Sequence, residues 1–212
     1  MADKTITQLD SLENLSNDDL FVCVDISSET TKKVTYGNLI TNVTGSLPPG
    51  LGGSGLGWAR YDDNQYTTSS VFSVTTAAGD VTLPNNASNT IETHLHSSIS
   101  FYNSGSQKVQ VENNADVYMT TIVFRAKTSN ANGTHIRLQL DSTGATPYER
   151  VGKDLFFGKG NDVWHDFHEV FQYYADSDFV TNGNRWKVRA VGHDVSIANI
   201  IFFIQRTQNH RA

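Results

Sequence analysis

Short runs of alternating apolar and polar residues recur along the chain after residue 58. The clearest are residues 136–140 and 186–190, in which every second side chain is apolar. Strict alternation predicts antiparallel strands that have one face on a core and the other in water. The expected strands cover residues 71–74, 81–83, 99–102, 108–111, 117–126, 136–140, 167–174, 186–190 and 197–204. About nine or ten strands of this kind, separated by turn signals, are typical of an antiparallel jelly-roll sandwich.

The last expected strand departs from this alternation because residues 197–204 are apolar on both faces. In an antiparallel sandwich only one face of a strand meets the core, so the other face needs a second partner. One interpretation is a central strand covered by a loop, and the other is a subunit interface at a three-fold axis. We prefer the interface, because an exposed apolar face on a C-terminal strand is otherwise costly. The candidate trimer contacts are Ile200, Ile201, Phe202, Phe203 and Ile204.

The first 57 residues are organised differently. Residues 21–26 and 31–35 predict two strands joined by a turn, and Thr35 is placed to cap a short helix that begins at Tyr36. The segment 45–57 contains six glycines and the pair Pro48-Pro49, which excludes a helix or an interior strand. We therefore expect three parts, namely a small adaptor (1–44), a Gly/Pro-rich linker (45–57) and a jelly-roll head domain (58–212). The linker is either a passive spacer or a joint between a lattice and a head of different symmetry.

The adaptor carries the strings LSNDDLFVCVD at 15–25 and TTKKVTYGNL at 30–39. This segment resembles the N-terminal segment of tailed-bacteriophage fibre and appendage proteins, and the match covers about a fifth of the chain. It departs from the family pattern at Cys23, where an aliphatic residue is more usual. The resemblance implies an adaptor that fixes a fibre, knob or decoration to the virion. By this resemblance the attachment residues are Leu15, Asp18, Asp19, Leu20, Phe21, Val24, Lys32, Lys33, Val34, Tyr36 and Leu39.

Composition and charge restrict the classes of partner that this chain can bind. The formal net charge is −6 and no run of Lys and Arg occurs, which argues against a nucleic-acid partner. No apolar stretch approaches the roughly 20 residues of a membrane span, and the first residues lack a signal core. We expect a soluble chain made in the host cytoplasm, without membrane insertion. Cys23 is the single cysteine, so no intrachain disulfide can form.

Two groups of histidines are candidates for chemistry. His94 and His96 would share one face of a strand, which could begin a metal site, but no third ligand stands at a telling spacing. In residues 164–169, Asp166 and His168 would share one face and His165 would lie on the other. We prefer a polar sheet face for the first pair and an ordinary strand for the second segment. The sequence therefore predicts no metal site and no cofactor.

Paired carboxylates are the other catalytic candidates. Asp62 with Asp63, or Asp176 with Asp178, could supply the two acids that glycosidase chemistry needs. Paired acids are also common in solvated loops, and no nucleophile elbow or phosphate loop occurs. We expect no enzymatic activity and no catalytic residues.

Aromatic residues in polar loops are the candidates for ligand binding. Their rings offer rigid area for stacking on sugars, while neighbouring Asn, Asp and Gln supply hydrogen bonds. The candidates are Tyr61, Tyr66, Tyr148 and Trp164.

The resemblance of the adaptor, taken with the two-faced last strand, implies a bacteriophage virion structural protein on the virion surface. Its partners would be other virion proteins of the capsid, neck or tail, two further copies of itself, and a host cell-surface glycan. A compact head with a two-faced last strand also resembles the trimeric knobs of viral fibres, by analogy of fold. The alternatives are a stand-alone carbohydrate-binding module and, third, a small glycan hydrolase.

Overall fold

In the computed structural model, residues 20–25, 30–35, 56–93 and 99–208 are described. The chain divides into two compact units, Met1–Gly52 and Gly53–Ala212. In the first unit, β1 (Leu20–Asp25) and β2 (Thr30–Thr35) pair as an antiparallel hairpin, which confirms the two predicted strands. The expected helix from Tyr36 lies outside the described residues, as does the Gly/Pro-rich segment up to residue 55. The boundaries of adaptor and linker therefore stay a prediction.

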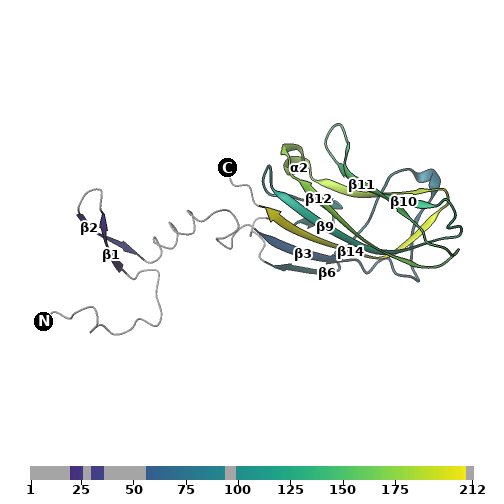
Figure 1. The fold of residues 1–212 in the computed structure, drawn as a ribbon, viewed down its shortest axis with the longest axis horizontal. Helices are drawn as coiled ribbons and strands as arrows, with labels where there is room; N and C mark the ends of the chain where they lie inside the picture. The colour runs from purple at the N-terminus through teal and green to yellow at the C-terminus, as the bar shows by residue number, and fades with distance from the viewer. Residues whose placement is uncertain (1–19, 26–29, 36–55, 94–98, 209–212) are drawn as a thin grey trace. The chain divides into compact units, whose positions relative to one another are not determined.

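The described residues of the second unit form two antiparallel sheets (Figure 1). The first sheet contains, in spatial order, β12 (His165–Tyr174), β9 (Val117–Thr128), β14 (Val195–Gln208), β3 (Gly57–Asp62) and β6 (Asn89–Thr93), with β4 (Phe72–Val74) paired to β14. The second sheet contains β11 (Glu149–Phe156), β10 (His135–Ser142), β13 (Asn184–Val191), β8 (Lys108–Val109) and β7 (Tyr102–Asn103), with β5 (Val81–Thr82) paired to β13. The helical segments among the described residues are the 3-10 helix η2 (Thr76–Ala78) and the α-helix α2 (Ser177–Asn182).

The strand pairs are nested along the chain. β3 pairs with β14, β8 with β13, β9 with β12, and β10 with β11, so early strands pair with late ones and the middle strands pair with each other. A long hairpin rolled up in this way is the jelly-roll arrangement. The predicted fold class, mainly β with a C-terminal jelly-roll sandwich, is confirmed.

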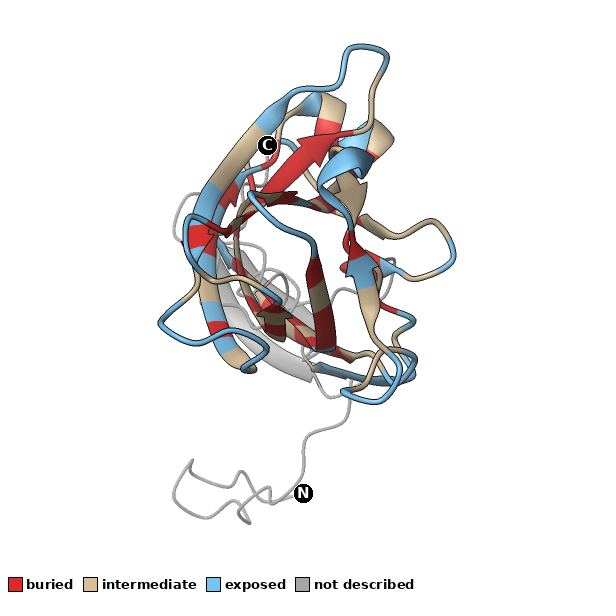
Figure 2. Cartoon of the chain, turned by 90° about the vertical axis from the view of Figure 1, so that its right-hand side faces the viewer, coloured by how far each residue is buried: buried red, intermediate tan, exposed pale blue. Residues whose placement is uncertain are grey.

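Alternation along the strands places the core between the two sheets (Figure 2). In β9 every second residue is buried, beginning with Tyr118, and in β10 and β13 the buried faces carry Ile136, Leu138, Trp186 and Val188. These are the residues that period-two alternation assigned to the buried face of each strand. The register of the sandwich thus follows directly from the apolar pattern at residues 136–140 and 186–190.

Three strands and the two helical segments of the described second unit were not expected from the sequence. β3 begins at Gly57, directly after the glycine-rich segment, and β6 and β11 are largely exposed strands with few apolar residues. The pair Asn182-Gly183 has the composition of a two-residue hairpin turn. Instead Asn182 ends α2, and Gly183 follows it at φ 68°, a conformation that glycine adopts readily.

The end of β14 carries a buried cation. The side chain of Arg206 is fully buried, and its Nη1 forms ion pairs with Glu112 and with Asp116, the latter at 3.2 Å from Oδ2. The Tyr118 hydroxyl donates to the same Asp116 oxygen at 3.3 Å. Buried charges are tolerated when they are paired and hydrogen-bonded. This cluster therefore connects the segment that precedes β9 to the C-terminal end of β14.

We expect Arg206→Met to destabilise the protein by about 3–5 kcal/mol, because it removes the cation beside a buried carboxylate. Urea unfolding followed by tryptophan fluorescence measures this, since all three tryptophans lie in the second unit. Arg60→Met is the matched control. Arg60 pairs with Asp62 but is 45% exposed, so its loss should cost less than about 1 kcal/mol. Equal costs for the two variants would contradict a special role for the buried cluster.

Candidate functional site

β14 presents different residues to its two faces. Ile200, Phe202 and Ile204 are fully buried in the core between the sheets, so they are not available to a neighbouring subunit. Ile201 and Phe203 lie on the opposite, outer face and are partly exposed. Of the five candidate interface residues, the structure therefore leaves these two in a position to contact a partner.

A bulge in β14 accounts for part of the apolar pattern, because it brings both Ile197 and Ile200 onto the core face. The register with β9 shifts between Ala198 and Ile201, and Asn199 has a positive φ of 55°. One extra residue reverses the direction of every following side chain. Ile197 and Ile200 therefore both face the core, although three positions separate them. The backbone N–H of Asn199 donates to the carbonyl of Tyr66 at 2.8 Å, which secures the bulge.

Apolar side chains of β3, β9 and β12 lie near Ile201 and Phe203 on the outer face of the first sheet, where Asp62 and Arg60 are their direct partners on β3. Phe203 stacks on Trp58 with ring centroids 5.3 Å apart. The register places Ile201 beside Val123, and Phe203 in one cross-strand row with Thr121 and the 58%-exposed Val170. We call this surface the outer apolar patch. Its members are Trp58, Thr121, Val123, Val170, Ile201 and Phe203.

The predicted attachment residues fall in two groups. Leu20, Phe21 and Val24 lie in β1, and Lys32, Lys33 and Val34 lie in β2, with Phe21 opposite Val34 in the register. The remaining five lie outside the described residues, namely Leu15, Asp18, Asp19, Tyr36 and Leu39. The hairpin thus brings parts of the two strings that carry the resemblance side by side in the backbone.

The four aromatic candidates do not form one site. Tyr61 is 1% exposed, and its hydroxyl donates to Glu92 Oε1 at 2.7 Å, so its ring belongs to the core and cannot stack on a sugar. It was expected in a loop but lies in β3, where alternation directs it inward. Tyr66 packs on Phe72, with ring centroids 5.3 Å apart. Trp164 lies elsewhere, beneath two cations of β9, with Lys127 Nζ 5.2 Å from its ring centroid.

Tyr148 belongs to a charged cluster beside α2. Arg150 binds Asp176 through two nitrogens at 2.7 and 2.8 Å, and its guanidinium lies 4.9 Å from the Tyr148 ring centroid. Asp176 also caps α2 by accepting from the N–H of Phe179 at 2.8 Å. The hydrogen bond from Arg150 holds the pKa of Asp176 far below its usual range. Asp178 binds the same arginine at 3.2 Å, so both acids of this pair are engaged in the fold.

The other acidic and histidine candidates are also engaged. Asp62 pairs with Arg60, and Asp63 accepts from the N–H of Tyr66 at 2.8 Å. Asp166 lies on the outer face and pairs with Arg125 at 2.9 Å, whereas His165 lies edge-on to Phe157 at 5.6 Å between centroids. This confirms that His165 and Asp166 point to opposite sides of the strand.

The described residues hold no group of three or more His, Cys, Asp or Glu placed to bind a metal. His94 and His96 lie outside those residues. Within the same part of the chain, no helix has the length and apolar character needed to span a bilayer.

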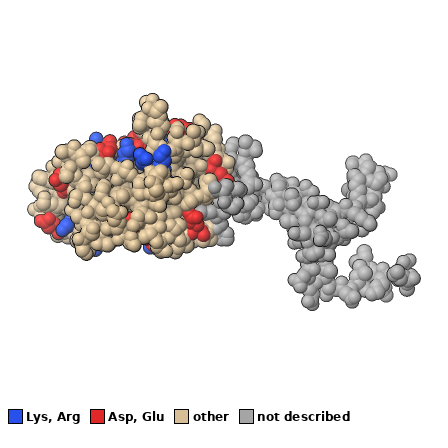
Figure 3. Space-filling model, turned by 180° about the vertical axis from the view of Figure 1, so that it is seen from behind, with Lys and Arg blue, Asp and Glu red and all other residues tan. Residues whose placement is uncertain are grey.

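Charged side chains are scattered on the second unit. On the face drawn in Figure 3, most of the surface is neither acidic nor basic; one group of basic atoms lies near the top of the view, and other basic and acidic atoms are scattered over this face. On the outer face of the second sheet, Lys187 pairs with Asp141 at 3.1 Å, and Arg189 lies 3.6 Å from Asp80. These cations are therefore bound to carboxylates of the same chain.

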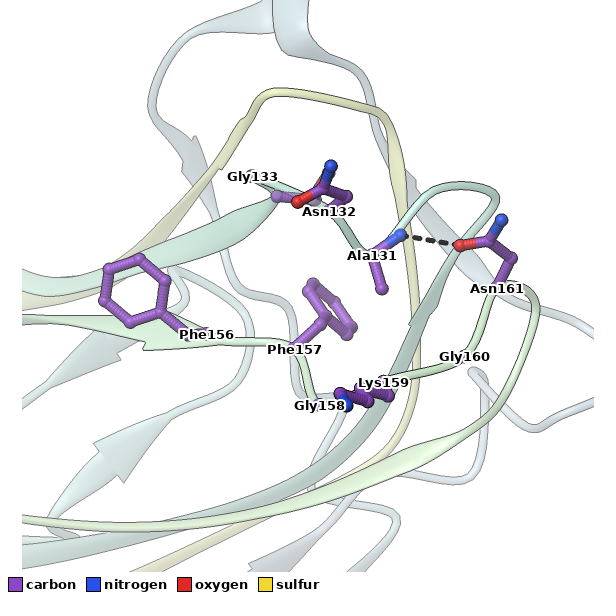
Figure 4. A pocket seen from close by; sticks show the side chains of 10 residues that line it. Ala131, Asn132, Gly133, Phe156, Phe157, Gly158, Lys159, Gly160 and Asn161 are labelled. Carbon is purple, nitrogen blue, oxygen red and sulfur yellow. Dashed lines mark hydrogen bonds between the residues drawn. The ribbon is translucent and has the colours of Figure 1, made fainter.

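Sequence reasoning missed a hollow between two loops. The segment after β9 and the segment after β11 enclose an open pocket of about 540 Å³ (Figure 4). Its lining comprises residues 131–134 and 156–161, including the rings of Phe156 and Phe157 and the amides of Asn132 and Asn161. The available signal was an aromatic pair at the end of a strand followed by Gly158-Lys159-Gly160. We call this hollow the loop pocket.

The sequence matches no protein-family model and no curated protein. Several solved structures resemble the fold at low identity. Eiger TNF from S. frugiperda is 12% identical, with 74% of this chain and 96% of that chain covered and a TM-score of 0.42. The PRD1 vertex protein P5 is 10% identical, with 92% and 84% covered and a TM-score of 0.43. A Clostridium thermocellum xylanase 10B structure with CBM22-1 and GH10 modules is 13% identical, with 72% and 29% covered and a TM-score of 0.33. Likenesses at these scores identify neither a family nor a function for this chain.

We expect Asp176→Asn to lower stability at neutral pH by on the order of 1 kcal/mol, because the pair with Arg150 loses its negative charge. Asparagine can still cap α2, so the substitution isolates the charge. The folded-state pKa of Asp176 is depressed, so its contribution is present above the unfolded pKa of about 3.9 and is lost as pH falls toward the folded pKa. The difference between wild type and variant should therefore shrink below about pH 4. Urea titrations across that range measure it, and a difference independent of pH would contradict the assignment.

Proposed function

We propose that this chain is a structural protein of a bacteriophage virion. Residues 1–44 attach it to the capsid, neck or tail, and residues 58–212 form a head that is displayed at the surface and engages the host. The observation that carries the proposal is the resemblance of residues 15–39 to fibre and appendage adaptors. It is supported by the division of the chain into two compact units, with the resemblance confined to the first. The proposed role is structural rather than catalytic.

We also propose that the head is a homotrimer built on the outer apolar patch. Trp58, Ile201 and Phe203 lie in β3 and β14, two interior strands of the first sheet, and Phe203 stacks on Trp58. Adjacent apolar side chains on the outer face of a sheet are typical of an interaction site. Identical copies related by rotation can cover it with one repeated contact. Three adaptors would then be presented together, which strengthens attachment without any additional contact per adaptor.

A stand-alone carbohydrate-binding module is the alternative. It would need the second unit alone and would not depend on the first 44 residues. A small glycan hydrolase would require an acid poised to donate a proton, whereas the depressed pKa of Asp176 favours its charged form. The attachment experiment below distinguishes both alternatives from the virion role, because neither of them requires binding to phage particles.

The first measurement is the mass of the full chain in solution by light scattering at micromolar concentration. We expect three times the monomer mass for the wild type and the monomer mass for Phe203→Glu, which places a charge in the centre of the outer apolar patch. Val180→Glu is the matched control, because Val180 lies on α2, is 39% exposed, and should leave the trimer intact. A monomeric wild type would remove the trimer proposal.

The second measurement is co-sedimentation of the full chain with phage particles that lack it. We expect binding by the wild type and binding at least about tenfold weaker for Lys32→Glu combined with Lys33→Glu, since the resemblance assigns both lysines to attachment. The control combines Lys127→Glu with Lys159→Glu, which makes the same change of charge in the second unit. Failure of the wild type to sediment with particles would contradict the attachment role.

A further inference from the structure

The loop pocket lies at the opposite end of the sandwich from Gly57, the first residue of β3. Gly57, where β3 begins, is opposite Arg206 near the end of β14, and Gln208 is opposite Val117, where β9 begins. β9 then runs for 12 residues, roughly 36–40 Å, before the loop that lines the pocket. A head tethered through residue 57 therefore has the pocket at its free end.

Hydrogen bonds fix the two loops that form the pocket walls. The side-chain oxygen of Asn161 accepts from the N–H of Ala131 at 3.0 Å and ties one loop to the other, as Figure 4 shows. The N–H of Asp162 donates to the carbonyl of Thr128 at 2.8 Å. The Asn130 side chain accepts from the N–H of Asn132 at 3.0 Å within its own loop. A ligand would meet walls that are already in place, which lowers the entropic cost of binding.

Two phenylalanines give the pocket an apolar wall. Phe157 packs edge-on against His165 and Phe167, with centroids 5.6 Å away in each case, so its position is fixed from behind. Phe156 is 69% exposed and is held on one side by His135, at 5.0 Å between centroids. A large apolar ring that is exposed but positioned is suited to stack on the apolar face of a sugar ring. The amide of Asn132 can bind hydroxyl groups.

The pocket also has one available positive charge. Lysines 108, 127, 153, 159 and 187 are the lysines of the second unit. Four of them have partners in the fold. Lys108 donates to the Asn182 carbonyl and Lys127 lies over the Trp164 ring, while Lys153 pairs with Glu169 and Lys187 with Asp141. Among the described residues, the exposed Lys159 has no such partner. It is also the one ionisable residue of the pocket lining.

We propose that the loop pocket binds a sugar unit that carries a carboxylate. The sugar ring stacks on Phe156, hydroxyls bind Asn132, and the carboxylate pairs with the Lys159 ammonium, a charge-assisted contact. Glycines 133, 158 and 160 leave the backbone of both loops accessible to the ligand. The volume of about 540 Å³ falls in the range of small-molecule sites. This inference rests on the proposed display role, because display leaves this end of the head free to meet a host glycan.

The test is saturation-transfer NMR on the full chain with D-glucuronate, D-galacturonate and N-acetylneuraminate, and with D-glucose as the neutral probe. We expect at least one acidic sugar to bind more tightly than D-glucose. Lys159→Gln should raise its Kd by about tenfold or more, and Phe156→Ser should abolish the signal. Tyr148→Ser is the matched control, because Tyr148 is an exposed aromatic residue outside the pocket and its loss should leave binding unchanged.

Absence of binding by all three acidic sugars would overturn the proposal, as would binding that neither pocket variant weakens. Equal affinity for D-glucose and the acidic sugars would overturn the role of Lys159. Because the assay uses no particles, its outcome is independent of the co-sedimentation result. Sugar binding without particle attachment would support the pocket proposal and contradict the display role. Particle attachment without sugar binding would support the display role and contradict the pocket proposal.

Discussion

The arrangement of the second unit depends on the two faces of β14. This strand pairs with β3, β4 and β9 and is the central strand of the first sheet. Its inward side chains fill the core, and its last buried residue, Arg206, is paired with two carboxylates. Its outward side chains, Ile201 and Phe203, make the centre of the outer apolar patch. One strand therefore stabilises the fold and supplies the surface on which copies of the chain would associate.

The sequence predicted the fold class well where one face of a strand meets the core and the other meets water. Residues 136–140 and 186–190 alternate for this reason, and their buried residues were correctly assigned. β11 was missed because it is an edge strand in which Leu155 alone is buried, so it has little apolar pattern to detect. The bulge at Asn199 was missed because a reversal of side-chain direction depends on the pairing with β9, not on local composition.

The candidate ligand site was harder to predict for a related reason. Tyr61 and Phe156 are both aromatic residues near polar segments, yet one is 1% exposed and the other 69%. Tyr61 lies in a strand whose neighbours on both sides bring its face onto the core, whereas Phe156 stands at the end of an edge strand. The loop pocket combines segments that start more than 20 residues apart in the sequence. A local sequence pattern cannot predict that these two segments lie close together. Their proximity results from the antiparallel pairing of β9 with β12 and of β10 with β11.

These features fit one account, in which the adaptor holds the chain to a particle, the outer apolar patch gathers three heads, and the loop pocket faces outward. A cryo-EM reconstruction of particles carrying this protein tests that account most directly. The account predicts density for three jelly-roll heads around one axis, with the first sheets facing the axis and residues 129–134 and 157–164 at the end away from the particle. Single heads, or heads with those loops against the particle surface, would contradict it.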